Sequence, residues 1–169
     1  DCRLHVAGAH NVLNALAAVA LASELGVAAA AIRRALAEFR GVRRRCERLG
    51  CWRGVEFMDD YAHHPTAVAA TLAAARAEFP GRRLVCAFQP HQVSRTRMLL
   101  SELAASLCGA DDVLILPVYS AREGTREAQA AAQELVQATT QAGTRVRFVP
   151  TLDRLVATLE TDARPGEVI

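Results

Sequence analysis

A run of acidic, phenolic and imidazole side chains at residues 59–64 is the part of this sequence best suited to chemistry. Its ionisable members are Asp59, Asp60, Tyr61, His63 and His64. A carboxylate at a strand end can accept hydrogen bonds from a ribose or hold Mg²⁺ through water, and a histidine at a helix start can move a proton near neutral pH. A helix cap before Pro65 would use only one of these groups. We therefore interpret the run as a functional site.

The same run leaves a metal site open as an alternative. A small metallohydrolase would use the carboxylates and imidazoles of Asp59, Asp60, His63 and His64. Adjacent histidines at a strand–helix junction point in different directions, so His63 and His64 cannot both easily reach one ion. We therefore expect no metal ligands at these positions and keep the hydrolase as an alternative.

A second polar segment, residues 88–97 (FQPHQVSRTR), follows an apolar run and opens a predicted helix. Free N–H groups at a helix N-terminus attract anions, and the guanidinium groups of Arg95 and Arg97 suit a carboxylate or a phosphate. Two cations at a helix N-terminus oppose the helix dipole, so they need a partner. We therefore predict an anion site in this segment.

Two features near the N-terminus leave more than one interpretation open. Residues 43–45 are all arginine, which from composition alone indicates a solvated linker. Asn11 and Asn14 are three residues apart and face one side of a helical turn. Capping accounts for Asn11 but not for Asn14 inside an alanine-rich helix. The Asn14 amide could contact the edge of a base, beside an equally open structural role.

Alternating helices and short apolar strands must position these segments. The pattern predicts helices near residues 10–25, 28–39, 65–79, 94–107, 125–141 and 152–159, and strands near 46–49, 55–58, 83–88, 112–118, 146–149 and 167–169. Such alternation is typical of an α/β fold with a parallel, doubly wound sheet. The carboxyl ends of its strands hold residues 59–64, 89–97 and 119–126, so three polar loops should meet at one edge.

The first helices have no predicted sheet to pack against, and the composition changes at the basic triplet. We therefore predict a domain boundary near residue 43, which divides the chain into residues 1–43 and 44–169. The strand predicted at residues 167–169 has only three residues. We expect the chain to be a piece of a longer protein.

Composition excludes several function classes. The chain has 169 residues with a formal net charge of +2, which argues against nucleic-acid binding through bulk charge. All 20 basic side chains are arginine, so neither a Schiff-base lysine nor a P-loop lysine can come from this chain. Five cysteines without a CxxC pair predict buried free thiols in a reducing compartment. No signal peptide or membrane-spanning apolar run is present, so we expect a cytoplasmic protein without membrane contacts.

Four segments together resemble the Mur ligases, the ATP-dependent family that builds the peptide of the bacterial cell wall. They are GAHNVLN at 8–14, RRCE at 44–47, with cysteine where phenylalanine is usual, DDYAHHPT at 59–66 and FQPHQVSRTR at 88–97. The last two are most similar to members that join L-alanine to UDP-N-acetylmuramate. Members that recycle murein peptides share the third segment but differ in the fourth, and they remain an alternative, as does a non-catalytic nucleotide-binding module.

The resemblance implies a Rossmann-like C-terminal domain with a mostly parallel sheet flanked by helices, preceded by two helices from the end of a central ATP-binding domain. ATP would phosphorylate the carboxylate of UDP-N-acetylmuramate, and the amine of L-alanine would attack the acyl phosphate. The resemblance assigns ATP binding to His10, Asn14, Arg45 and Asp60, and the L-alanine and acyl-phosphate site to Tyr61, His63, His91 and Arg95. The Mg²⁺ ligands would lie mainly in the remaining domains of the same polypeptide, so this chain alone should not catalyse ligation.

Overall fold

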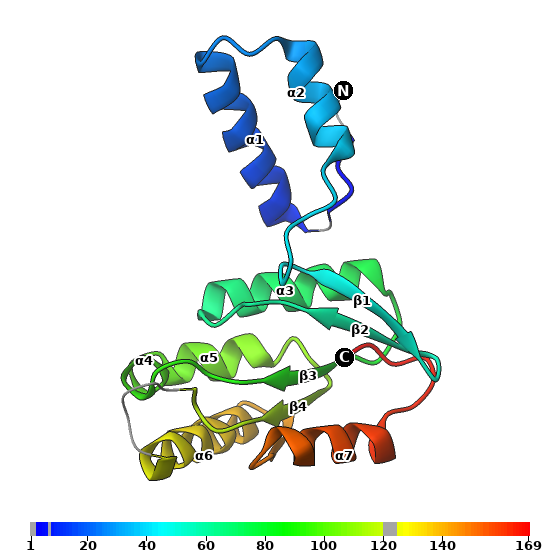
Figure 1. The fold of residues 1–169 in the computed structure, drawn as a ribbon. Coiled ribbons are helices and arrows are strands. Elements are labelled where there is room, and N and C mark those ends of the chain that lie inside the picture. The colour runs from blue at the N-terminus through cyan, green and yellow to red at the C-terminus, as the bar shows by residue number, and fades with distance from the viewer. Residues whose placement is uncertain (1–2, 7, 120–124) are drawn as a thin grey trace.

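The computed structural model describes residues 3–6, 8–119 and 125–169 (Figure 1). Its helices are α1 Ala9–Glu24, α2 Ala29–Glu38, α3 Pro65–Glu78, α4 Val93–Met98, α5 Leu100–Leu107, α6 Thr125–Gln141 and α7 Leu152–Asp162. Its strands are β1 Glu47–Trp52, β2 Val55–Asp59, β3 Val85–Phe88, β4 Asp112–Ile115 and β5 Arg145–Phe148. The predicted α/β fold is confirmed.

The strands form two sheets that residues 167–169 join into one. β3, β4 and β5 are parallel, whereas β1 and β2 form an antiparallel hairpin. Between the two sheets, Val168 bridges Glu56 on one side and Leu84 on the other, in parallel in both cases. Backbone hydrogen bonds of 2.8 to 3.1 Å hold residues 167–169 on both edges. The short strand predicted there is thus the link between the hairpin and the parallel sheet.

Helices cover both faces of the parallel sheet. On one face α3, α5 and α6 contribute apolar side chains such as Leu72, Leu107 and Leu135 to the larger core. On the other face α7 packs Leu159 against Leu114 of β4. This two-sided packing is what the continuous apolar strands predicted, because a strand buried on both faces needs apolar residues at successive positions.

The hairpin turn leads into β2, which ends where the predicted functional segment at residues 59–64 begins. Arg53 and Gly54 have φ values of 51° and 78°. A two-residue hairpin turn of the primed type requires both central residues in this left-handed region. β2 then ends at Asp59, where the acidic and imidazole run begins. The turn lies between the two strands that the sequence pattern predicts near residues 46–49 and 55–58.

The pair α1 and α2 stands apart from the sheet (Figure 1). Neither helix contains a buried residue, and Val12, Leu16 and Leu21 on α1 are all exposed. The two helices contact one another, and α1 also approaches α3. No helix in the described part of the chain has both the length and the apolar content to cross a membrane. The domain boundary at residue 43 stays a prediction.

Candidate functional site

Three loops meet at the carboxyl edge of the sheet and bring four rings together. Tyr61 and His63 follow β2, His91 follows β3, and Tyr119 follows β4. The ring centroids are 5.1 Å apart for Tyr61 and His63, 5.3 Å for Tyr61 and His91, 5.2 Å for His63 and His91, and 5.2 Å for His91 and Tyr119. Three of these residues were predicted from the sequence and Tyr119 was not. Residues 120–124, also part of the predicted third loop, lie outside the described residues.

The two imidazoles of this ring cluster differ in how they are held. The Nδ1 atom of His63 lies 2.8 Å from the carbonyl oxygen of Tyr61, and because a carbonyl only accepts, Nδ1 carries the proton. The His91 ring lies nearly parallel to that of His63, at 18°. Burial lowers the pKa of His91, and the neighbouring His63, Arg95 and Arg44 lower it further. His91 is therefore neutral at pH 7 and able to accept a proton.

Arg44 also contacts the ring cluster, and its role was not predicted from the sequence. Its Nε atom donates to Asp59 at 3.2 Å, and its guanidinium carbon lies 4.8 Å from the centroid of the Tyr61 ring. Its carbonyl oxygen accepts a hydrogen bond of 2.9 Å from the Tyr61 N–H. The arginine triplet is therefore more than a solvated linker, because Arg44 ties the segment before β1 to the site.

The helix predicted over residues 94–107 is wrong, since α4 ends at Met98 and α5 begins at Leu100. Arg95 and Arg97 consequently lie in the last turn of a six-residue helix, where cations match the dipole. The dipole argument for an anion site therefore fails. Arg97 instead forms an ion pair of 2.9 Å with Glu134 of α6.

Arg95 differs from Arg97 in having no such partner in the part of the chain that the structure describes. Within the described residues, its side chain makes no hydrogen bond or ion pair, and it is half-buried. Its charge contributes to the lowered pKa of His91, which places it next to the ring cluster. A half-buried guanidinium without a carboxylate partner is suited to bind an anionic ligand group.

A pocket of about 670 Å³, called the α1 pocket below, lies between α1, the segment before β1 and the start of α3, and both polar and apolar side chains line it. The residues that the resemblance assigned to ATP all line it, namely His10, Asn14, Arg45 and Asp60. His64, a member of the predicted functional run, and Thr66 line the same pocket, although the resemblance assigned neither of them to ATP. His63 faces the ring cluster, so the two adjacent histidines serve different sites. Binding of ATP in this pocket stays a prediction.

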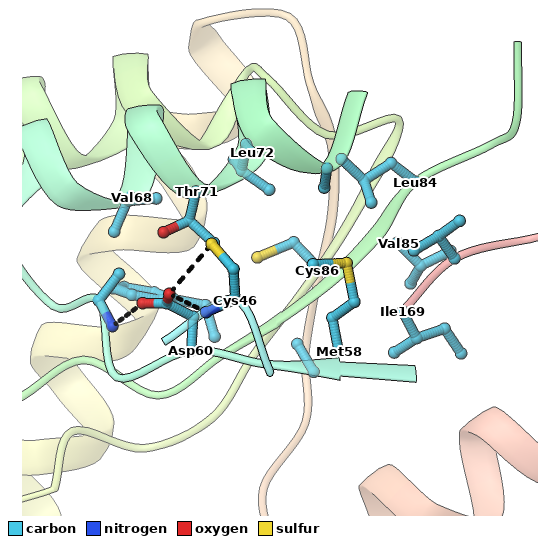
Figure 2. A pocket seen from close by; sticks show the side chains of 15 residues that line it. Cys46, Met58, Asp60, Val68, Thr71, Leu72, Leu84, Val85, Cys86 and Ile169 are labelled. Carbon is cyan, nitrogen blue, oxygen red and sulfur yellow. Dashed lines mark hydrogen bonds between the residues drawn. The ribbon is translucent and has the colours of Figure 1, made fainter. Parts of the chain in front are cut away.

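Asp60, which lines the α1 pocket, is held by hydrogen bonds to both of its carboxylate oxygens (Figure 2). Its Oδ1 atom accepts the Ala62 N–H at 2.7 Å. Its Oδ2 atom accepts the Cys46 N–H at 2.8 Å and the Cys46 thiol at 3.5 Å. A carboxylate offers about four acceptor positions, so one remains for a ribose hydroxyl. Asp60 therefore has a structural role that the sequence did not reveal, beside the proposed contact to nucleotide.

Two cysteines, together with this carboxylate, line a smaller, mostly apolar cavity of about 140 Å³ (Figure 2). Burial, with help from the neighbouring carboxylate, raises the pKa of Cys46 to about 11, and burial raises the pKa of Cys86 to about 12. Both thiols stay protonated at neutral pH and are weak nucleophiles. All four described cysteines are free. Cys51 and Cys108 are exposed, so the prediction of burial is wrong for them, and Cys2 lies outside the described residues.

No metal-binding constellation is found in the described part of the chain. No three side chains of histidine, cysteine, aspartate or glutamate lie close enough there to hold an ion. His63 and His64, the imidazoles that the metallohydrolase alternative needs together, face different pockets. That alternative therefore has no ligand set among these residues.

Comparisons with known proteins give one consistent family. Residues 44–169 match the family model described as Mur ligase, glutamate ligase domain. The whole chain is 43% identical to UDP-N-acetylmuramate–L-alanine ligase of Acidithiobacillus ferrooxidans and 39% identical to that of Desulfitobacterium hafniense, and it covers 36% and 38% of those proteins.

Solved structures agree with the sequence relatives. A UDP-N-acetylmuramate-alanine ligase from Thermotoga maritima superposes with a TM-score of 0.78 at 30% identity, over 99% of this chain and 34% of that one. A murein peptide ligase from Psychrobacter arcticus gives a TM-score of 0.76 at 28% identity, over 99% and 34% of the two chains. The chain therefore spans about a third of the length of the relatives it matches.

Proposed function

The chain belongs to the Mur ligase family, and from this membership we propose that it is the C-terminal part of a UDP-N-acetylmuramate–L-alanine ligase. Residues 1–43 would end the central ATP-binding domain, and residues 44–169 would form the C-terminal domain. Curated relatives of that name at 39 to 46% identity support this activity over murein-peptide recycling. The observation that carries the proposal is a pair of sites, the ring cluster at the sheet edge and the α1 pocket.

The ring cluster would hold the incoming amino acid. The guanidinium of Arg95, which has no carboxylate partner among the described residues, suits the carboxylate of L-alanine or an oxygen of the acyl phosphate. A neutral His91 can accept a proton from the ammonium group, which frees the amine to attack the acyl carbon. The ring of Tyr61 and the fixed imidazole of His63 would limit the orientations available to the amino acid. Positioning of this kind supplies much of the rate in a reaction between two bound groups.

The α1 pocket would receive ATP. The Asn14 amide suits the edge of the adenine, Asp60 has acceptor capacity left for a ribose hydroxyl, and Arg45 suits a phosphate. His10 lines the same pocket as these groups. The described residues supply no carboxylate set for Mg²⁺, so the ion would be held mainly by the remaining domains, where it would neutralise charge on the transferred phosphate.

Phosphate release tests the proposed activity. We expect the longer protein that carries this chain to release phosphate only when ATP, Mg²⁺, UDP-N-acetylmuramate and L-alanine are all present. The 169-residue chain alone should release none, because it lacks a phosphate-binding lysine. Turnover by the chain alone would refute the assignment of the phosphate-binding groups to other domains. Turnover of the longer protein with L-alanyl peptides but not with L-alanine would instead identify a murein-peptide ligase.

The lowered pKa of His91 predicts the pH dependence of the reaction. The neutral imidazole is the reactive form, and it is lost only when the pH falls through a pKa below the usual 6.5. The acidic limb of kcat/KM should therefore have its midpoint below pH 6.5. His63, Arg95 and Arg44 contribute to the shift, so Arg95→Ala should move the midpoint upward. A wild-type midpoint above 6.5 would exclude neutral His91 as the proton acceptor.

A further inference from the structure

One aromatic neighbour of His91 comes from a loop to which no role has been assigned. Tyr119 follows β4, and two backbone hydrogen bonds join its position to the His91 loop. The Tyr119 N–H donates to the Pro90 carbonyl at 2.7 Å, and the Gln92 N–H donates to the Tyr119 carbonyl at 3.0 Å. Neither bond involves a side chain. The backbone therefore keeps residue 119 beside His91 whatever side chain it carries.

The Tyr119 ring uses this position to contact the imidazole. The two centroids are 5.2 Å apart and the planes differ by 40°, within the range of attractive ring pairs. Val118, one residue earlier, is 4% exposed and anchors the loop in the core, whereas Tyr119 is 57% exposed. An exposed ring contributes little to the core, so the contact to His91 is the main interaction that its side chain makes within the described residues.

His91 is surrounded by rings from both neighbouring loops. Tyr61 meets it at 84° and His63 lies at 18° to it, both from the loop after β2. Tyr119 adds a third ring, from the loop after β4. An imidazole with three ring neighbours has few rotamers open to it, and removal of one neighbour would allow it to turn.

Resting on the proposed ligase function, we propose that Tyr119 is a positioning residue of the amino-acid site, whose ring holds the His91 imidazole toward the ammonium group of the incoming amino acid. The ring and not the hydroxyl carries this role, since the contact is between rings. Phenylalanine at position 119 should therefore suffice, and alanine should not. Burial lowers the pKa of His91, so loss of the ring should also raise that pKa.

Steady-state kinetics of the longer protein test the role in catalysis. Tyr119→Ala should lower kcat/KM for L-alanine about five- to tenfold, the equivalent of one aromatic pair, and leave the KM for ATP unchanged. Tyr119→Phe should stay within about twofold of the wild type, as should Trp52→Ala, a matched control at an exposed aromatic on the hairpin. Equal losses for L-alanine and ATP, or no loss in Tyr119→Ala, would overturn the proposal.

Nuclear magnetic resonance on the 169-residue chain tests the contact without any ligase activity. The His91 ring protons should move downfield in Tyr119→Ala but not in Tyr119→Phe, and their titration midpoint should rise toward 6.5 in the alanine variant only. Among the described residues, the other charged or titratable groups that face His91 are unchanged in both variants, namely Tyr61, His63, Arg44 and Arg95. Unchanged shifts in Tyr119→Ala would overturn the positioning role. A confirmed contact in a protein without ligase activity would refute the proposed function and leave the contact standing.

Discussion

Replacement of Arg95 by alanine should lower kcat/KM of the longer protein for L-alanine by about 10²- to 10³-fold, the usual loss when one charge-stabilising group is removed from an active site. Arg95 is half buried beside His91, and within the described residues its guanidinium has no carboxylate partner. Its charge is therefore available for the carboxylate of the amino acid or for the acyl phosphate. Initial rates at varied L-alanine and fixed, saturating ATP measure this loss.

Arg97 provides the matched control for this experiment. It has the same side chain, lies two residues away on α4, and is already paired with Glu134 at 2.9 Å. Arg97→Ala should leave kcat/KM within about threefold and change stability by less than about 1 kcal/mol, because the ion pair is exposed. Similar losses from the two variants would show that α4 contributes general positive charge and that Arg95 has no specific role.

Replacement of Arg83 by alanine should give the largest loss of stability, about 3 kcal/mol in the free energy of unfolding. The Arg83 guanidinium lies 2.7 Å from Glu167 and 3.2 Å from Asp112, and the two carboxylate side chains are only 6% and 4% exposed. Without Arg83, two buried negative charges lose their closest cation. The value is at the low end for a broken buried pair because Arg83 itself is 37% exposed. Urea unfolding should measure it.

Arg145 is the matched control for Arg83. It approaches the same Asp112 carboxylate, but at 3.7 Å and with 67% of its side chain exposed. Arg145→Ala should therefore cost less than about 1 kcal/mol. Arg83→Lys should fall between the two, since one ammonium group cannot bridge two carboxylates as a guanidinium fork does. Equal losses of unfolding free energy for Arg83→Ala and Arg145→Ala would show that the carboxylates depend on the total positive charge nearby and not on direct contact with Arg83.

The sequence predicted the elements and the sheet edge because those depend on local patterns. The strand predicted near residues 112–118 is a short continuous apolar run, and the helix predicted near residues 65–79 has apolar residues at helical spacing. The break at Leu99 could not be predicted, because the helical pattern runs through it. Leu99, between the two helices, has φ −110° and ψ 27° and packs against the larger core.

Two site residues, Arg44 and Tyr119, were not predicted for a different reason. Arg44 reaches Asp59 and Tyr61 across the segment before β1, and Tyr119 reaches His91 across two adjacent loops. These contacts join positions that are distant in sequence, so composition could only describe Arg44 as part of a basic linker. The family resemblance identified the residues that line the α1 pocket. The sequence pattern alone did not decide whether Asn14 binds a ligand or has a structural role.

The location of residues 167–169 decides when the hairpin can join the parallel sheet during synthesis. β2 has left the ribosome long before its neighbour at Val168, an interval on the order of ten seconds at ordinary rates of translation. Until then its inner edge has unpaired N–H and C=O groups, which can pair with an edge from another nascent chain. Slow translation between residues 60 and 166 should therefore favour aggregation. Faster delivery of residues 167–169 would protect this protein without any change in its final stability.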